Sequence, residues 1–182
     1  AAGLMIMRAD VNQRIERYAA LLSAMDNKVD LYTPDSPLQL TPSEQQTIVI
    51  VLNGDLYLIA RIRQYVLLRL DTALSAGEAT YDFPILSVEH VLPQNPAEGS
   101  IWTQWFTTVE EREKYVHKIG NLVLLSRRKN SQAQNYDFVT KKEKYFKTSD
   151  GISPFAITTQ VLNYDTWTPA IIEKRQKEQI QK

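Results

Sequence analysis

The apolar residues of this chain change their spacing once, near residue 80, and that change limits the fold more than any other feature. Before it, apolar side chains recur every three or four residues over 4–25 and again over 55–74, as in amphipathic helices. After it, the apolar runs have the length of strands, at 85–91 ("ILSVEHV") and 121–126 ("NLVLLS"). The pattern predicts an α+β fold that is mainly helical and contains a small sheet.

Polar stretches with prolines separate these elements and indicate how the chain is divided. A loop over 27–41 ends at a capping residue before a second helix, and the closing helix has Pro169 in its first turn. Because the chain does not begin with methionine, we expect a fragment of a longer protein. The expected parts are a helical lead, a core with the strands, and a helical tail that packs on the lead, over 1–80, 81–150 and 151–182.

Composition excludes several kinds of site. The 182 residues are 43% hydrophobic and include no cysteine, so the chain has enough apolar residues for a core but no thiolate ligand, disulfide or cysteine nucleophile. A metal ion would therefore bind to oxygen or imidazole. The longest apolar runs, such as 47–52, are too short to cross a bilayer, and no secretory signal precedes them. We expect a cytoplasmic protein without membrane contact.

The net charge is zero, but basic residues gather in one region, residues 117–147. This segment contains eight lysines and arginines but only two acidic residues. Such a run is either a solvated helix face or a contact surface for phosphates, and the second interpretation needs a phosphate-cutting site nearby.

Glu89 and His90 form a charged pair at the end of the first apolar strand. Adjacent strand residues point to opposite faces unless the strand ends or bends, and Pro93 is placed to end it. A carboxylate and an imidazole brought together there could bind a hard cation and deprotonate a water molecule. In the other interpretation, His90 is a hydrogen-bonded core histidine and Glu89 a surface carboxylate. Both interpretations are open from these two residues alone.

Three motifs in order resemble the HNH nucleases, whose sites are also called ββα-metal or His-Me finger sites. The run from Glu89 to Pro93 ("EHVLP") resembles the acidic ligand and general-base histidine of that family. Asn121 and Asn130 resemble its loop-fixing asparagine and its later metal ligand, nine residues further on. The segments "IGNLVLL" and "KNSQAQNYDFVTKK" more specifically resemble the C-terminal nuclease domain of GmrSD-type modification-dependent restriction enzymes and related phage-defence proteins.

This resemblance implies a ββα-metal core at 81–150 and a metal-dependent endonuclease that nicks or cuts DNA. Glu89 and Asn130 would bind one Mg²⁺ or Mn²⁺, His90 would act as the general base, and Asn121 would fix the loop. The implied partners are DNA and an N-terminal sensor or NTPase domain outside this chain. Basic residues expected to contact the phosphate backbone are Arg128, Lys129 and Lys141.

Two further features have ordinary structural interpretations. We expect His117, at the end of a helix, to be a surface residue rather than a metal ligand. The aromatic run of Trp102, Trp105 and Phe106 is typical of side chains that fill a hydrophobic core rather than of a surface that stacks on bases. An alternative function is a non-catalytic nucleic-acid-binding or assembly module that keeps the nuclease fold.

Overall fold

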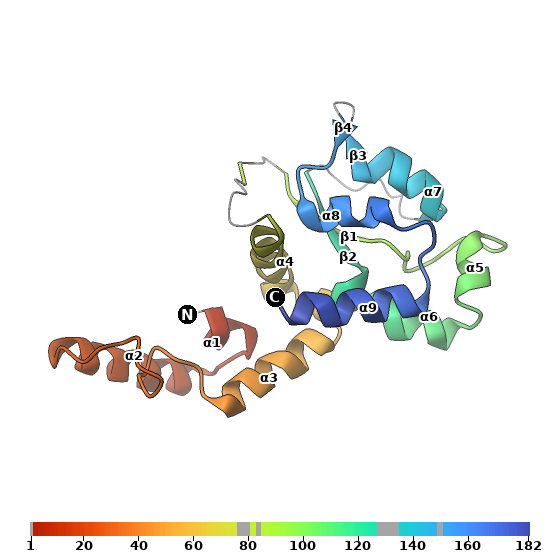
Figure 1. Ribbon diagram of the computed structural model, residues 1–182. Coiled ribbons are helices and arrows are strands. Elements are labelled where there is room, and N and C mark those ends of the chain that lie inside the picture. The colour runs from red at the N-terminus through yellow and green to blue at the C-terminus, as the bar shows by residue number, and fades with distance from the viewer. Residues whose placement is uncertain (1, 76–80, 83–84, 127–134, 149–150) are drawn as a thin grey trace. The chain divides into compact units, whose positions relative to one another are not determined.

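The computed structural model describes residues 2–75, 81–82, 85–126, 135–148 and 151–182 (Figure 1). The chain forms two compact units, residues 1–51 and 52–182. Across the described ranges, no helix combines the length and the apolar character needed to cross a bilayer.

The N-terminal unit contains α1 (Ala2–Ile6), α2 (Val11–Asp26) and most of α3 (Pro42–Asn53). The single helix expected over 4–25 is therefore wrong, because the chain breaks between α1 and α2. Arg8 takes a left-handed φ of 58°, and Asp10 then begins α2 with a capping box shared with Gln13. The local capping chemistry of Asp10 thus overrides the continuous apolar period.

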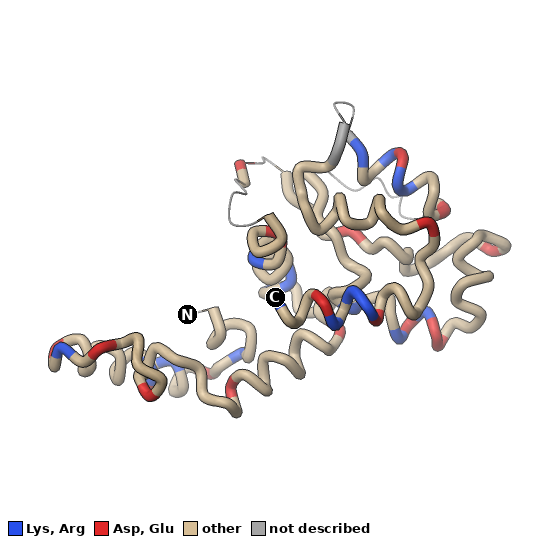
Figure 2. The backbone as a smooth tube through the Cα atoms, in the orientation of Figure 1, with Lys and Arg blue, Asp and Glu red and all other residues tan. Residues whose placement is uncertain are grey.

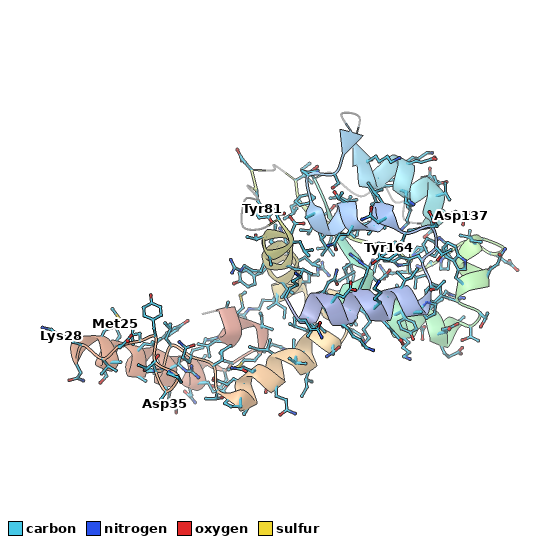
Figure 3. The ribbon with its side chains drawn as sticks, viewed as in Figure 1. Met25, Lys28, Asp35, Tyr81, Asp137 and Tyr164 are labelled. Carbon is cyan, nitrogen blue, oxygen red and sulfur yellow. The ribbon has the colours of Figure 1, made fainter. Side chains whose placement is uncertain are left out.

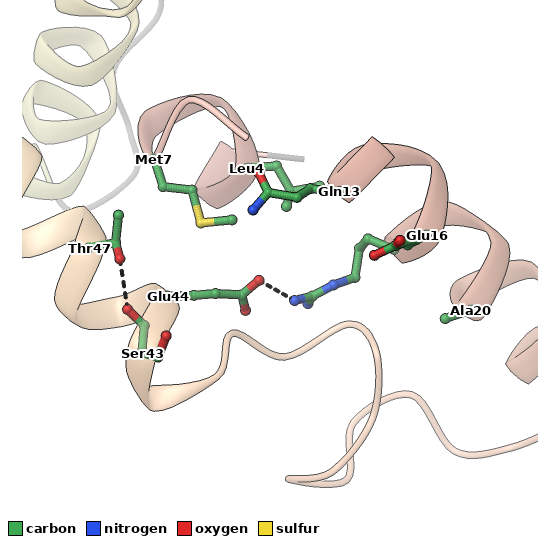
Figure 4. A pocket seen from close by; sticks show the side chains of 9 residues that line it. Leu4, Met7, Gln13, Glu16, Ala20, Ser43, Glu44 and Thr47 are labelled. Atoms are coloured by element: carbon green, nitrogen blue, oxygen red, sulfur yellow. Dashed lines mark hydrogen bonds and ion pairs between the residues drawn. The ribbon is translucent and has the colours of Figure 1, made fainter. Parts of the chain in front are cut away.

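Arg17 holds the loop between α2 and α3 in place. Its guanidinium donates to the carbonyls of Pro37 and Gln39 and pairs with Glu44, beside a hollow between α1, α2 and α3 (Figure 4). Glu44 also accepts from Thr41 N, while the Thr41 hydroxyl accepts from Glu44 N, so Thr41, one of two candidates in the sequence together with Ser43, caps α3. Most of the apolar stripe on α2 stays exposed, including Val11, Ile15, Tyr18, Leu22 and Met25, the last of which is labelled in Figure 3.

The C-terminal unit contains the strands. β1 (Ser87–His90) pairs antiparallel with β2 (Leu122–Leu125), with His90 opposite Leu122. β3 (Lys147–Thr148) pairs with β4 (Gly151–Ile152). Both expected strands are confirmed, and the chain has the expected mainly helical α+β fold. The helical elements around them are η1 (Leu56–Leu58), α4 (Ala60–Leu74), α5 (Ile101–Trp105), α6 (Val109–Val116), η2 (Ile119–Asn121), α7 (Phe138–Lys141), η4 (Lys142–Phe146), α8 (Ala156–Thr159), η5 (Gln160–Asn163) and α9 (Pro169–Ile180).

The helix expected over 55–74 is divided into the short η1 and the longer α4. α4 contacts β1, β2 and α8, so it belongs to the unit that holds the strands rather than to a separate helical lead. Asp71 of α4 is buried and accepts from Ile157 N, at the start of α8, and from the hydroxyl of Tyr81, which is labelled in Figure 3. α8 is thereby tied to α4.

An aromatic core lies on the side of α5, α7 and the segment before α9. Trp102, Phe106, Phe138 and Trp167 are fully buried. Trp102 donates its indole N–H to the carbonyl of Tyr136 at 2.9 Å, which satisfies its one polar group. The aromatic run beginning at Trp102 is therefore part of the core, as expected from the sequence.

α9 lies against η2, the turn that leads into β2. Gly120 of this turn has no room for a side chain, because a Cβ would meet the carbonyl of Ile172 and the backbone of Gln176. The Gln176 side chain accepts from Gly120 N at 2.8 Å, and the buried Arg175 guanidinium donates to the Gly120 and Ile157 carbonyls. The turn and the last helix are therefore one packed element.

Candidate functional site

The β1–β2 hairpin places Glu89 and His90 at the buried end of β1. Their exposed fractions are 6% and 3%. Successive strand residues point to opposite faces, and accordingly these two side chains have different neighbours. Glu89 faces Lys141 at the end of α7, whereas His90 faces His117, which follows α6.

Lys141 is 1% exposed, and its ammonium lies between the two residues of the pair. Its Nζ is 3.3 Å from Glu89 Oε1 and donates to the backbone carbonyl of His90 at 2.6 Å. A buried carboxylate is costly unless a positive group compensates it, and Lys141 supplies that charge. The sequence predicts Lys141 as a contact to the phosphate backbone. In the structure its charged end is turned inward, toward the end of β1.

His90 lies in a cluster of ring side chains with His117 and Tyr57. Its Nε2 is 3.3 Å from Nδ1 of His117, and its Nδ1 is 3.5 Å from the amide nitrogen of Gln94. The Tyr57 ring lies 4.0 Å from the His90 ring and 5.5 Å from the His117 ring, measured between centroids, and is nearly parallel to the latter. The guanidinium carbon of Arg63 lies over the Tyr57 ring, 4.3 Å from its centroid.

The environment of His117 favours its neutral form. Burial lowers the pKa of His117 below its usual value, and the opposing effect of the Asp55 carboxylate is smaller. Asp55 itself pairs with Lys118 at 3.1 Å, so its charge is partly compensated. A neutral imidazole has one nitrogen that accepts a hydrogen bond, which makes His117 a suitable acceptor at neutral pH.

Asn121 lies at the end of η2, beside the chain that leaves β1. Its Oδ1 accepts from Leu92 N at 2.8 Å and from the Trp167 indole at 2.9 Å. Its Nδ2 donates to the carbonyls of Leu92 at 3.0 Å and Val116 at 2.9 Å. The backbone carbonyl of Asn121 accepts from Val91 N. One buried amide thus joins the segment after β1, the end of α6 and the segment before α9.

The remaining residues expected at the site are Arg128, Lys129 and Asn130, which lie outside the described residues. Within the described part of the chain, no three His, Cys, Asp or Glu side chains gather as a metal-binding group. Mg²⁺ is often bound by one or two carboxylates, with water and substrate phosphates completing its shell. The buried carboxylate of Glu89 fits such a site in its donor chemistry.

Two contacts of His90 were not anticipated from the sequence. Tyr57 comes from η1, far from the motif, and only the tertiary fold brings it to the strand end. His117 was expected at the surface, yet it contacts His90. The available signal was its position three residues before Gly120, in a chain with only two histidines.

The comparisons with known proteins agree with this division of the chain. The family model described as GmrSD restriction endonucleases, C-terminal domain, matches residues 52–182, which is the extent of the second compact unit. No curated protein matches the chain. The match covers well over half of the chain and includes the β1–β2 hairpin with Glu89, His90 and Asn121. The chain therefore belongs to the family of C-terminal domains of GmrSD restriction endonucleases.

Proposed function

We propose that the unit 52–182 is an HNH-type endonuclease that hydrolyses phosphodiester bonds of DNA, with His90 as the general base. The observation that carries this proposal is the buried Glu89–His90 pair at a strand end, beside a loop joined by Asn121, in a member of a restriction endonuclease family. A restriction endonuclease family favours DNA as the substrate.

Glu89 would bind one Mg²⁺ or Mn²⁺ together with Asn130, water and a phosphate oxygen of the substrate. Carboxylate and amide oxygens are hard ligands that suit these ions, and the chain has no cysteine that would favour zinc. When bound, the ion supplies positive charge for the non-bridging phosphate oxygen and the leaving 3′-oxygen.

His90 would take a proton from a water molecule, and the resulting hydroxide would attack phosphorus in line with the leaving group. The bond between phosphorus and the 3′-oxygen breaks, and the 3′-oxygen takes a proton from solvent. The products are a 5′-phosphate and a 3′-hydroxyl. Asn121 does not touch the reacting atoms in this scheme. It holds the segment after β1, and with it the backbone position of His90.

DNA affinity would come from basic residues near the strand end. Arg128 and Lys129 stay candidates from the sequence, and Lys144 and Lys147 are exposed in the structure. Figure 2 shows that basic positions gather along the segment of α7 and η4. Lys141 is not among these candidates, because its ammonium is buried. Contacts to phosphate give affinity without sequence preference and weaken with salt.

The test is cleavage of supercoiled plasmid by the full chain with Mg²⁺, Mn²⁺ or EDTA. We expect nicked or linear product with either ion and none with EDTA. His90→Ala should slow cleavage by roughly 10²- to 10⁴-fold, since it removes the general base while keeping the fold and the DNA affinity. Lys114→Ala is the matched control, because Lys114 is exposed on α6. Cleavage by folded His90→Ala at the rate of the control would contradict the proposal.

A second candidate is a DNA-binding module without catalysis. The Glu89–Lys141 pair favours it, because an ammonium already compensates the carboxylate that would bind the metal ion. In that case the chain would bind DNA in a salt-dependent manner, and no divalent ion would produce cleavage.

A further inference from the structure

The contact between the two histidines has no part in the reaction proposed above. His117 Nδ1 lies 3.3 Å from His90 Nε2, within hydrogen-bonding distance. We propose that His117 is a positioning residue, which accepts a hydrogen bond from His90 Nε2–H and thereby keeps the lone pair of His90 on Nδ1. This role rests on the proposed function of His90 as the general base.

The neighbours of His90 support this tautomer. A neutral imidazole has one N–H and one lone pair, so only one ring nitrogen of His90 can accept a proton. The amide nitrogen of Gln94 lies 3.5 Å from His90 Nδ1, and an amide N–H can only donate. Nδ1 is therefore the acceptor, and Nε2 carries the hydrogen that points to His117. Gln94 thus donates a hydrogen bond to His90, and His90 donates one to His117.

His117 is itself held in place by contacts on two sides. Its backbone carbonyl accepts from Tyr57 N at 3.1 Å, and the Tyr57 ring stacks on its imidazole with an interplanar angle of 10°. Arg63 fixes Tyr57 in turn by donating to its carbonyl at 2.7 Å. The acceptor is thus placed by the fold before any substrate binds, which is the condition for efficient positioning.

The arrangement also suits the proton transfer. Gln94 is exposed, so its amide can move away from Nδ1 and leave that lone pair to an incoming water molecule. When Nδ1 takes the proton, the bond from Nε2–H to His117 becomes charge-assisted and stronger. His117 is a good acceptor for it, since burial lowers its pKa and keeps it neutral. A neutral histidine would then do for His90 what a carboxylate does for the histidine of a serine-protease triad.

The test compares two substitutions of the same residue in the full chain. His117→Phe keeps a ring against Tyr57 but removes the acceptor, whereas His117→Asn places an amide oxygen near the position of Nδ1. We expect kcat for plasmid cleavage to fall roughly 10- to 100-fold in His117→Phe with KM unchanged, and to stay within about threefold of wild type in His117→Asn. Equal activity of His117→Phe and wild type, or equal losses in both variants, would overturn the proposal.

A second readout needs no nuclease activity. Nitrogen-15 NMR of the histidine rings at a pH where both are neutral reports which nitrogen of His90 carries hydrogen. We expect Nε2–H in the wild type and in His117→Asn, and a mixture of tautomers in His117→Phe. A wild-type His90 with hydrogen on Nδ1 would disprove the positioning role. If the wild type cuts no plasmid but shows the Nε2–H tautomer, the proposed function fails while the histidine contact stands.

Discussion

Two buried polar regions meet on the β1–β2 hairpin, and they are built in different ways. Around Asn121, one neutral amide makes four hydrogen bonds of 2.8 to 3.0 Å. Around Glu89 and His90, the side chains lie 3.3 to 3.5 Å from polar atoms of Lys141, His117 and Gln94. The first region uses the full bonding capacity of its amide, while these three side-chain contacts of the second are longer.

This difference separates a region that holds the fold from one suited to chemistry. An amide with all of its hydrogen bonds made at good distances gains nothing from a ligand and loses stability if it moves. Long contacts of carboxylate and imidazole groups are common in catalytic sites without substrate and shorten when it binds. We therefore expect substitutions near Asn121 to change stability first, and substitutions near His90 to change activity first.

Asn121→Ala should have the largest effect on stability. It removes four hydrogen bonds and leaves Leu92 N and the Trp167 indole N–H buried without an acceptor. We expect the free energy of unfolding to fall by about 4 kcal/mol, measured by urea denaturation. Asn95→Ala is the control, because Asn95 is an exposed asparagine just after Pro93. A loss no larger than that of the control would remove the distinction between the two regions.

Lys141→Met should have the next largest effect, because it leaves the buried Glu89 carboxylate without its ammonium. We expect a loss of about 3 kcal/mol in the free energy of unfolding. Mg²⁺ at millimolar concentration should restore part of this loss, and should stabilise the variant more than the wild type, since a bound ion would replace the missing charge. Lys147→Met is the control. Equal stabilisation of variant and wild type by Mg²⁺ would argue against Glu89 as the metal ligand.

Asp71 has features of both regions. Its substitution should give the smallest change in stability, and that change should depend on pH. It is charged like Glu89, but its hydrogen bonds from Ile157 and Tyr81 are both short, 2.8 Å. Burial raises the pKa of Asp71, and these hydrogen bonds only partly oppose the rise. Because the folded-state pKa exceeds the unfolded one, ionisation destabilises the folded protein as pH rises from the ordinary aspartate range through the raised value.

Asp71→Asn does not titrate, so its stability relative to wild type should improve over that pH range. Thermal unfolding of both proteins across the range measures the change. A difference in stability that stays constant with pH would show that the Asp71 carboxyl has the same pKa in the folded and unfolded states.

Much of the hairpin could be predicted from the sequence, because its signals are local. The strands follow from their β-branched and leucine-rich runs, and Pro93 and Asn121 mark the segments that leave β1 and enter β2. The apolar pattern does not predict the break before α2, because its period continues across it. Only the capping pair of Asp10 and Gln13, together with the left-handed Arg8, reveals it.

The contacts of the site were harder to predict, because they join distant parts of the chain. His117 and Tyr57 reach His90 from the end of α6 and from η1, and no spacing rule connects these segments. Lys141 was placed among surface lysines because its neighbours in sequence are basic. A lysine at the end of a helix can nevertheless bury both its aliphatic chain and its ammonium, if a buried carboxylate such as that of Glu89 lies within reach.

The absence of a side chain at Gly120 has a consequence for the order of events during synthesis. The turn before β2 has its close neighbours in Ile172 and Gln176 of α9, more than fifty residues later in the chain. While a nascent chain is still shorter than this, the turn has no surface to close against and the Gly120 carbonyl lacks its partner Arg175. The hairpin can therefore reach its final form only after α9 has left the ribosome. We therefore expect the site at the end of β1 to form only once translation of residues 52–182 is complete.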